Sequence, residues 1–157
     1  MTAEFEKLAY EAALRSLDKQ EAYVEELRAR TGVLLAASSL AASFLGQQAF
    51  QSPSPRGLVI VSLLAFVVST GIDVFILMPK RDLVFAQKGE DLYQGLFIAQ
   101  GDMPRVYRSL THRLDGFWES NDTKIGWLIW SFAIAAVALT VEILALAALI
   151  LGNILSS

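Results

Sequence analysis

Three long stretches of the chain are almost free of charge, and polar segments separate them. Residues 32–50 contain no charged residue, residues 57–79 contain only Asp73, and residues 125–157 contain only Glu142. Each stretch is close to or longer than the ~20 residues that a helix needs to cross the ~30 Å hydrocarbon core of a bilayer. The pattern predicts an all-α integral membrane protein with three transmembrane helices.

The polar segments divide the chain further. We predict six parts, which are a cytoplasmic N-terminal helix (1–30), transmembrane helix 1 (31–50), an extracytoplasmic turn (51–56), transmembrane helix 2 (57–79), a cytoplasmic helical segment (80–124) and transmembrane helix 3 (125–154). The turn, "QSPSPRG", is rich in Pro, Ser and Gly and is short, so it predicts an antiparallel hairpin of the first two spans. The last apolar run exceeds one crossing, but no Pro or turn cluster divides it, so tilting or projection would absorb the surplus.

The N-terminal segment is composed of strong helix formers. "EFEKLAYEAALRSLDKQEAYVEELRAR", residues 4–30, contains neither Gly nor Pro. Apolar side chains recur at spacings of three, four and seven, which predicts one buried stripe: Tyr10, Leu14, Leu17, Val24 and Leu27. Nothing after Arg30 breaks the pattern, so one helix should continue from water into the first span.

The cytoplasmic segment between spans two and three carries further helix signals. "GEDLYQGLFIAQ" predicts a short helix, and Asp102 can cap a second one that has Pro104 in its first turn. The second helix has an apolar side, formed by Val106, Tyr107, Leu110, Leu114, Phe117 and Trp118. Three partners for this side remain open: the N-terminal helix, a neighbouring subunit and the membrane surface.

The basic residues predict the topology. Five of the thirteen Lys and Arg residues precede the first span, seven lie in residues 80–124, and only Arg56 lies in the turn. The positive-inside rule therefore places the N-terminus and residues 80–124 in the cytoplasm and the C-terminus outside. Trp127 and Trp130 fit an aromatic anchor at the inner interface. The first thirty residues lack the apolar region of a signal peptide, so the first span should act as its own insertion signal.

Glu142 is the most unusual residue of the apolar runs. It follows Trp127 by fifteen residues, which corresponds to ~22 Å along a helix. In the first span Ser43, Gln47 and Gln48 lie at a similar depth and could donate hydrogen bonds to it. An ionised side chain at this depth is costly, so it should face protein or water. Two interpretations remain: a pore-lining or proton-sensing carboxylate, and a protonated acid that bonds a neighbouring helix.

Other polar and small residues of the spans have simpler explanations. Asp73 lies near the cytoplasmic end of span two, where Arg28 or Arg30 could reach it by extending along the helix. In the first span, small residues repeat every four positions, which favours close helix packing. The two pairs are Ala37 with Ala41 and Ser39 with Ser43.

The residue inventory argues against catalysis. The chain has no Cys, and it lacks a Gly-rich phosphate loop, a cluster of metal ligands and a nucleophile motif, so we predict neither an enzyme nor a metal or cofactor site. His112, the single histidine, stands beside Arg113 and is expected to be an ordinary surface residue. The net charge of −3 argues against nucleic-acid binding.

Three segments carry a family resemblance: "LDKQEAYVEELRARTGVLLAASSLAASFLGQQAF" (17–50), "DLVFAQKGEDLY" (82–93) and "VYRSLTHRLDGFWESN" (106–121). Their arrangement is similar to the SLATT-type and Pycsar-type transmembrane effectors of bacterial anti-phage systems. The resemblance implies a protein that assembles in the inner membrane and permeabilises it when a nucleotide signal arrives. This chain differs in having a third long span and no fused nucleotide-binding domain, so no ligand residues are carried over.

The sequence therefore supports a homo-oligomer in the lipid of the bacterial inner membrane. Ser39, Ser43, Gln47 and Glu142 are predicted to line or brace a permeation path, with Asp73 as a further intramembrane polar residue. The cytoplasmic helices would hold the gate until a signalling partner or nucleotide second messenger displaces them. Basic candidates for such contacts are Lys80, Arg81, Arg105, Arg108 and Arg113. The alternative function is a non-conducting scaffold or accessory subunit that recruits a cytoplasmic partner.

Overall fold

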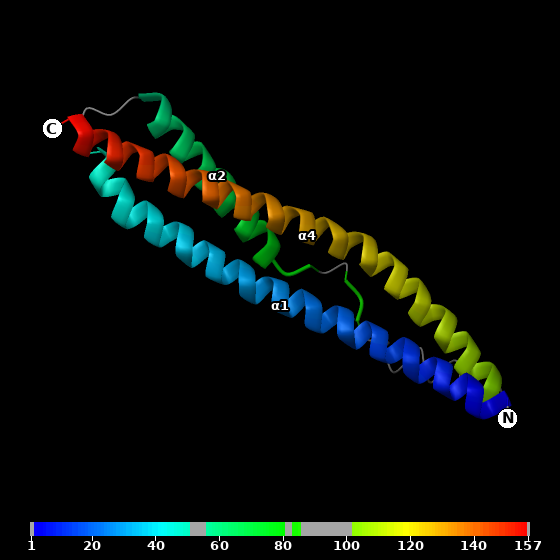
Figure 1. Ribbon diagram of the computed structural model, residues 1–157. Coiled ribbons are helices and arrows are strands. Elements are labelled where there is room, and N and C mark those ends of the chain that lie inside the picture. Colours follow the sequence, from blue (N-terminus) through cyan, green and yellow to red (C-terminus); the bar gives the residue numbers. More distant parts are fainter. Residues whose placement is uncertain (1, 51–55, 81–82, 86–101, 157) are drawn as a thin grey trace. The chain divides into compact units, whose positions relative to one another are not determined.

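Three α-helices contain nearly all residues that the computed structural model describes, which are 2–50, 56–80, 83–85 and 102–156 (Figure 1). The helices are α1, Thr2–Phe50, α2, Arg56–Leu77, and α4, Met103–Ser156. The predicted all-α class is therefore confirmed for this part of the chain. The predicted short helix in "GEDLYQGLFIAQ" and most of the turn at 51–56 lie outside it.

α1 is a single helix of 49 residues. The first thirty residues have high helix propensity, and the first glycine, Gly32, costs only ~1 kcal/mol relative to Ala in a helix interior. That cost is too small to end a helix whose neighbours pack. The predicted continuity beyond Arg30 is confirmed.

α4 is also continuous, over 54 residues, which the sequence pattern did not predict. Its start is as expected: the carbonyl of Asp102 accepts the first helical bond from the N–H of Val106 at 3.2 Å, and Pro104 occupies the first turn, where its missing N–H is not needed. We expected one helix to end near residue 124 and a span to begin at 125. The polarity changes there, but no Pro interrupts the backbone, so the helix continues.

α2 spans 22 residues and ends at Leu77, two residues before Pro79. Proline disfavours the α conformation of the residue that precedes it. The predicted span, 57–79, is therefore longer than the helix at its C-terminal end.

The described chain divides into two compact units. Unit 1 comprises Met1–Glu26 and Lys80–Trp127, and unit 2 comprises Leu27–Pro79 and Leu128–Ser157. All but two of the sixteen acidic residues and all but three of the thirteen basic residues belong to unit 1. The division by contacts therefore follows the division by charge.

In unit 1 the first part of α1 packs against the first part of α4. Ala13 and Leu17 form a buried cluster with Leu114, and Tyr10, Leu14 and Phe117 pack around it. The rings of Tyr10 and Tyr107 have centroids 5.6 Å apart. Early residues of α1 contact early residues of α4 and later residues contact later ones, so the two segments run parallel. The N-terminal helix is thus the partner of the apolar side of α4, although Trp118 of that side is 39% exposed.

In unit 2 α2 runs antiparallel to α4, and a side-chain hydrogen bond connects α1 to α4. Ser69 contacts Ala135, and Leu58 and Val59, near the start of α2, pack on Leu146 and Leu149, near the end of α4. Ser38 of α1 bonds to Glu142 of α4. For a residue of α2 and a residue of α4 that lie at the same height along the helix axes, the sum of the two residue numbers is therefore nearly constant.

Buried positions along α1 alternate between steps of three and four, with gaps of seven where one step is missing. This is the spacing of a heptad seam. The buried side chains are Glu6, Ala13, Leu17, Gln20, Val24, Leu27, Thr31 and Ser38. The predicted stripe is confirmed at Leu17, Val24 and Leu27.

Two helices are long and apolar enough to cross a membrane, judged by length and composition: α2 and the Met103–Gly152 part of α4. Among the described residues, the predicted first span, 31–50, is not one of these two helices. The third crossing and the orientation stay predictions.

Candidate functional site

Glu142 is buried in unit 2, with 1% of its surface exposed. Its Oε2 accepts a hydrogen bond of 2.9 Å from the hydroxyl of Ser38 on α1, and its Oε1 has no partner among the described residues. The expected neighbours were Ser43, Gln47 and Gln48, so the donor found is different. Ser43 and Gln47 are exposed, and the side chain of Gln48 lies outside the described residues.

Asp73 is completely buried, and neither carboxylate oxygen has a hydrogen-bond partner among the described residues. The predicted ion pair with Arg28 or Arg30 is therefore not formed in this structure. The Nε of Arg28 is itself buried without an acceptor. A carboxylate that lacks both a counter-ion and hydrogen bonds is among the costliest groups to bury.

Hydroxyl groups of unit 2 occupy buried positions as well. Ser69 donates to the carbonyl of Ala135 at 3.3 Å, and Thr31 donates to the carbonyl of Leu27 at 2.8 Å. The buried Oγ1 of Thr70 has no partner in the described chain. Ser62 is 5% exposed and shares the buried face of α2 with Ser69 and Asp73.

The residues predicted to line a pore lie mostly on the opposite side of α1 from Glu142. Ser39, Ser43 and Gln47 are exposed, and Ser39 donates to the carbonyl of Leu35 in its own helix. Ala37 and Ala41 are half-buried. Adjacent helical residues differ by about 100° in direction, so Ser38 faces the interior while Ser39 does not.

Sequence reasoning missed Ser38, although a signal was present. Leu17, Val24, Thr31 and Ser38 follow one another at intervals of seven residues. Extending the N-terminal stripe by two further heptads would have placed Ser38 on the buried face. The expectation rested instead on the pairs of small residues, which do not indicate which side of the helix faces the interior.

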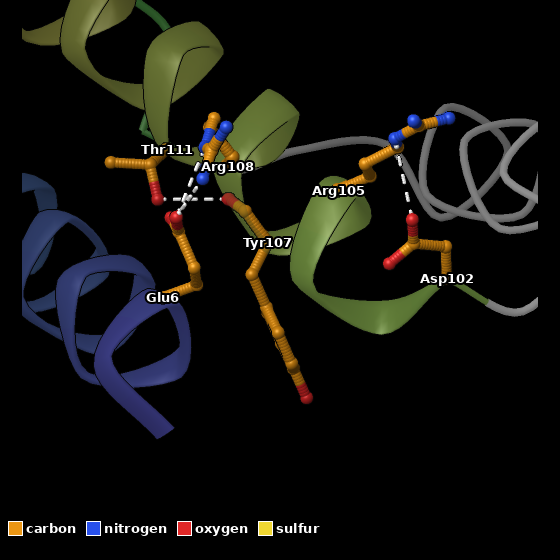
Figure 2. A network of polar contacts seen from close by, with 6 residues as sticks. All are labelled: Glu6, Asp102, Arg105, Tyr107, Arg108 and Thr111. Carbon is orange, nitrogen blue, oxygen red and sulfur yellow. Dashed lines mark hydrogen bonds and ion pairs between the residues drawn. The ribbon is translucent and has the colours of Figure 1, made fainter. Parts of the chain in front are cut away.

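Two of the predicted basic residues are occupied by ion pairs within unit 1 (Figure 2). Nε and Nη2 of Arg108 donate to the same carboxylate oxygen of Glu6, at 3.0 and 2.5 Å. The hydrogen bond to Glu6 and the charge of Glu6 raise the pKa of Arg108. Arg105 lies 3.3 Å from the carboxylate of Asp102. Arg108 thus links α4 to α1, whereas Arg105 pairs with the residue before its own helix.

Two of the three other basic candidates have interactions of their own. Lys80 and Arg113 interact with other residues, and Arg81 lies outside the described residues. His112 is exposed, as expected.

Asn121 forms a second contact that the sequence did not indicate. Its side-chain amide accepts a bond of 3.2 Å from the N–H of Val84 and donates one of 2.8 Å to the carbonyl of Val84. Asn121 is 1% exposed. The amide thus pairs with the backbone of one non-helical residue and holds 83–85 against α4.

The described residues contain no group of three or more His, Cys, Asp or Glu side chains that could hold a metal ion. We found no family model that matches the chain, and no curated protein or solved structure with significant similarity to it. The candidate site is therefore defined by the buried polar residues of unit 2 alone.

Proposed function

We propose that this protein is a homo-oligomer of the bacterial inner membrane that forms a permeation path when it is triggered. Unit 2 is the membrane part, and unit 1, with the N-terminus and residues 80–124, is cytoplasmic. By its resemblance to transmembrane anti-phage effectors, the path serves to stop growth of an infected cell. The trigger is a cytoplasmic partner or a nucleotide second messenger.

The observation that carries this proposal is the apolar surface of unit 2. Large apolar side chains are exposed on all three of its helices, including Val33 (70%), Leu64 (59%) and Trp130 (72%). Soluble monomers rarely expose apolar patches of such extent. Lipid is the environment in which these side chains are stable, and it fits the two helices that are long and apolar enough to cross.

The polar stripe on α1 supports assembly from several copies. Ser39, Ser43 and Gln47 are exposed within the uncharged run of 31–50. A glutamine amide has four hydrogen-bonding positions, and lipid chains satisfy none of them. Contact with a second copy, or with water in a path between copies, would satisfy them. Glu142 is buried inside the subunit and does not belong to this stripe.

The decisive experiment is native mass spectrometry of the protein in nanodiscs, followed by ion flux into liposomes. We expect a closed ring of four or more copies and flux through it. A monomer or dimer that passes no ions would contradict the proposal.

A scaffold that recruits a cytoplasmic partner is the second candidate. Phe5 and Leu8 on α1 of unit 1 are 71% and 64% exposed, which is unusual for a charged, water-facing unit. In this case the protein would form oligomers without ion flux. Replacing Phe5 and Leu8 by Ala would then abolish partner recruitment and leave the oligomer intact.

A further inference from the structure

Unit 2 holds two acids whose oxygens are not all satisfied. Asp73 has two such oxygens and Glu142 has one, and both side chains are at least 99% buried. An unpaired carboxylate in such surroundings is strongly destabilising, whereas a bound proton removes the charge. Neither acid takes part in the ion pairs described in unit 1, and neither belongs to the exposed stripe of Ser39, Ser43 and Gln47 on α1.

The helix register places the two acids at different depths. Ser69 contacts Ala135, and α2 and α4 are antiparallel. Glu142 lies seven residues beyond Ala135, and Asp73 lies four residues beyond Ser69 in the opposite direction. At 1.5 Å per residue the axial separation is ~16 Å, about half of the hydrocarbon thickness.

The register also identifies which polar residues lie near the level of each acid. Ser38 of α1 and Ser62 of α2 lie at the level of Glu142, and Ser69, Thr70 and Thr31 lie between the two acids on the side of Asp73. An apolar level that includes Leu139 separates the two groups. The register therefore gives two polar levels with an apolar level between them.

Few other charged groups face these levels. The described charged residues of unit 2 besides the two acids are Arg28 and Arg30 on α1 and Arg56 on α2. Arg30 and Arg56 are exposed, and Arg28 is half-buried. Only Arg28 has a buried donor without an acceptor, and the register brings it to the level of Asp73. Arg28 is thus the one described base placed to stabilise Asp73 after it loses a proton.

We propose that Asp73 and Glu142 are two proton-binding sites inside one subunit and that the proton is the species carried. The inference rests on the proposed function, specifies the proton as the permeating ion and places its route inside each subunit of the oligomer. Each acid takes up a proton on a free oxygen and releases it to the next acceptor when the apolar level opens. A metal cation is a poorer occupant, because it requires several oxygen ligands at one level, and the acids lie at two.

The test is proton flux into liposomes that contain the full-length protein. A potassium gradient with valinomycin imposes the potential, and an enclosed dye reports internal pH. We expect Asp73→Asn and Glu142→Gln each to reduce proton flux at least about tenfold, because neither amide can take up and release a proton. The matched controls are Asp122→Asn and Glu119→Gln, which neutralise exposed acids on α4 and should leave the flux unchanged.

Infrared spectroscopy gives a second readout that does not depend on flux. The wild-type protein in nanodiscs should show protonated carboxyl bands that each variant loses separately, with the oligomer unchanged in mass. Absence of both bands overturns the inference. Proton flux that persists in both variants, while the wild type conducts, overturns this inference alone. A wild type that passes no protons, and no potassium in liposomes without valinomycin, under any trigger overturns the proposed function as well.

Discussion

Ser38 and Ser39 are neighbours in the chain with different roles. Ser38 is buried and is the only donor found for Glu142 in the described structure, whereas Ser39 is exposed and bonds its own helix. We expect Ser38→Ala to lower the free energy of unfolding by about 1–2 kcal/mol, because a buried acceptor loses its partner. Ser39→Ala should change it by less than about 0.5 kcal/mol.

Denaturant titration in detergent micelles, with helix content as the readout, measures both variants. Equal effects of the two substitutions would show that the interior face of α1 is not the face that contains Ser38.

Asp73 should reduce stability in its present surroundings. Two buried oxygens without partners cost about 1–3 kcal/mol relative to satisfied groups. We therefore expect Asp73→Val to raise the unfolding temperature, since valine adds little volume and has no polar atom. Asp122→Val, at an exposed position, is the control. A marked loss of stability in Asp73→Val would indicate a partner for Asp73 that the described residues do not show.

At the scale of elements, Asn121 fastens the segment 83–85 to α4. Loss of its amide removes both bonds to the backbone of Val84. We expect Asn121→Ala to increase amide hydrogen exchange at Val84 at least about tenfold, which corresponds to ~1.4 kcal/mol. Ser120→Ala, an exposed neighbour, should leave this exchange unchanged. Unaltered exchange in Asn121→Ala would mean that other contacts hold the segment.

The ion pair of Glu6 and Arg108 connects α1 and α4 in unit 1. Glu6 is largely buried while Arg108 is exposed, so reversing the charge of Glu6 should be the more harmful change. We expect Glu6→Arg to lower the unfolding temperature and the added Arg108→Glu change to restore part of the loss. The pairing of Arg105 with Asp102 within α4 provides the control, because reversing Arg105 leaves the contact between helices intact. No restoration in the double variant would contradict the pairing.

The presence of the helices was more predictable than the residues at which they end and the sides that they bury. Propensity and the absence of breakers were sufficient to predict α1 as one helix and Asp102 as the start of α4. The sequence did not predict the continuity of α4, because the boundary at 124/125 follows the start of the nearly charge-free run at Ile125, whereas helices end at changes in backbone preference. The sequence alone marks Glu142 as unusual, and the heptad spacing from Leu17 to Ser38 indicates which side of α1 is buried. That Ser38 lies opposite Glu142 depends on packing between distant segments, which the sequence does not show.

At the scale of the whole molecule, the natural absence of cysteine allows a direct test of the exposed polar stripe. Single cysteines can replace Ser39, Ser43 or Gln47 without background. If these positions line a path between copies, a charged thiol reagent added in water should modify them in the triggered state. Cysteine at Leu64, which is exposed on apolar α2, should resist the reagent because lipid surrounds it. Equal modification at Leu64 would contradict the placement of α2 in lipid.

The directions of the three helices in unit 2 have an electrostatic consequence. A helix places about half of a positive charge at its N-terminus and about half of a negative charge at its C-terminus. The dipole of α2 opposes that of α4, while α1 runs with α4, so one helix dipole of the three remains uncompensated. Its negative end coincides with the ends of α1 and α4 at Phe50 and Ser156, which the proposed topology places outside the cell. The helix dipoles alone, without any side-chain charge, would attract cations to the outer mouth of the path.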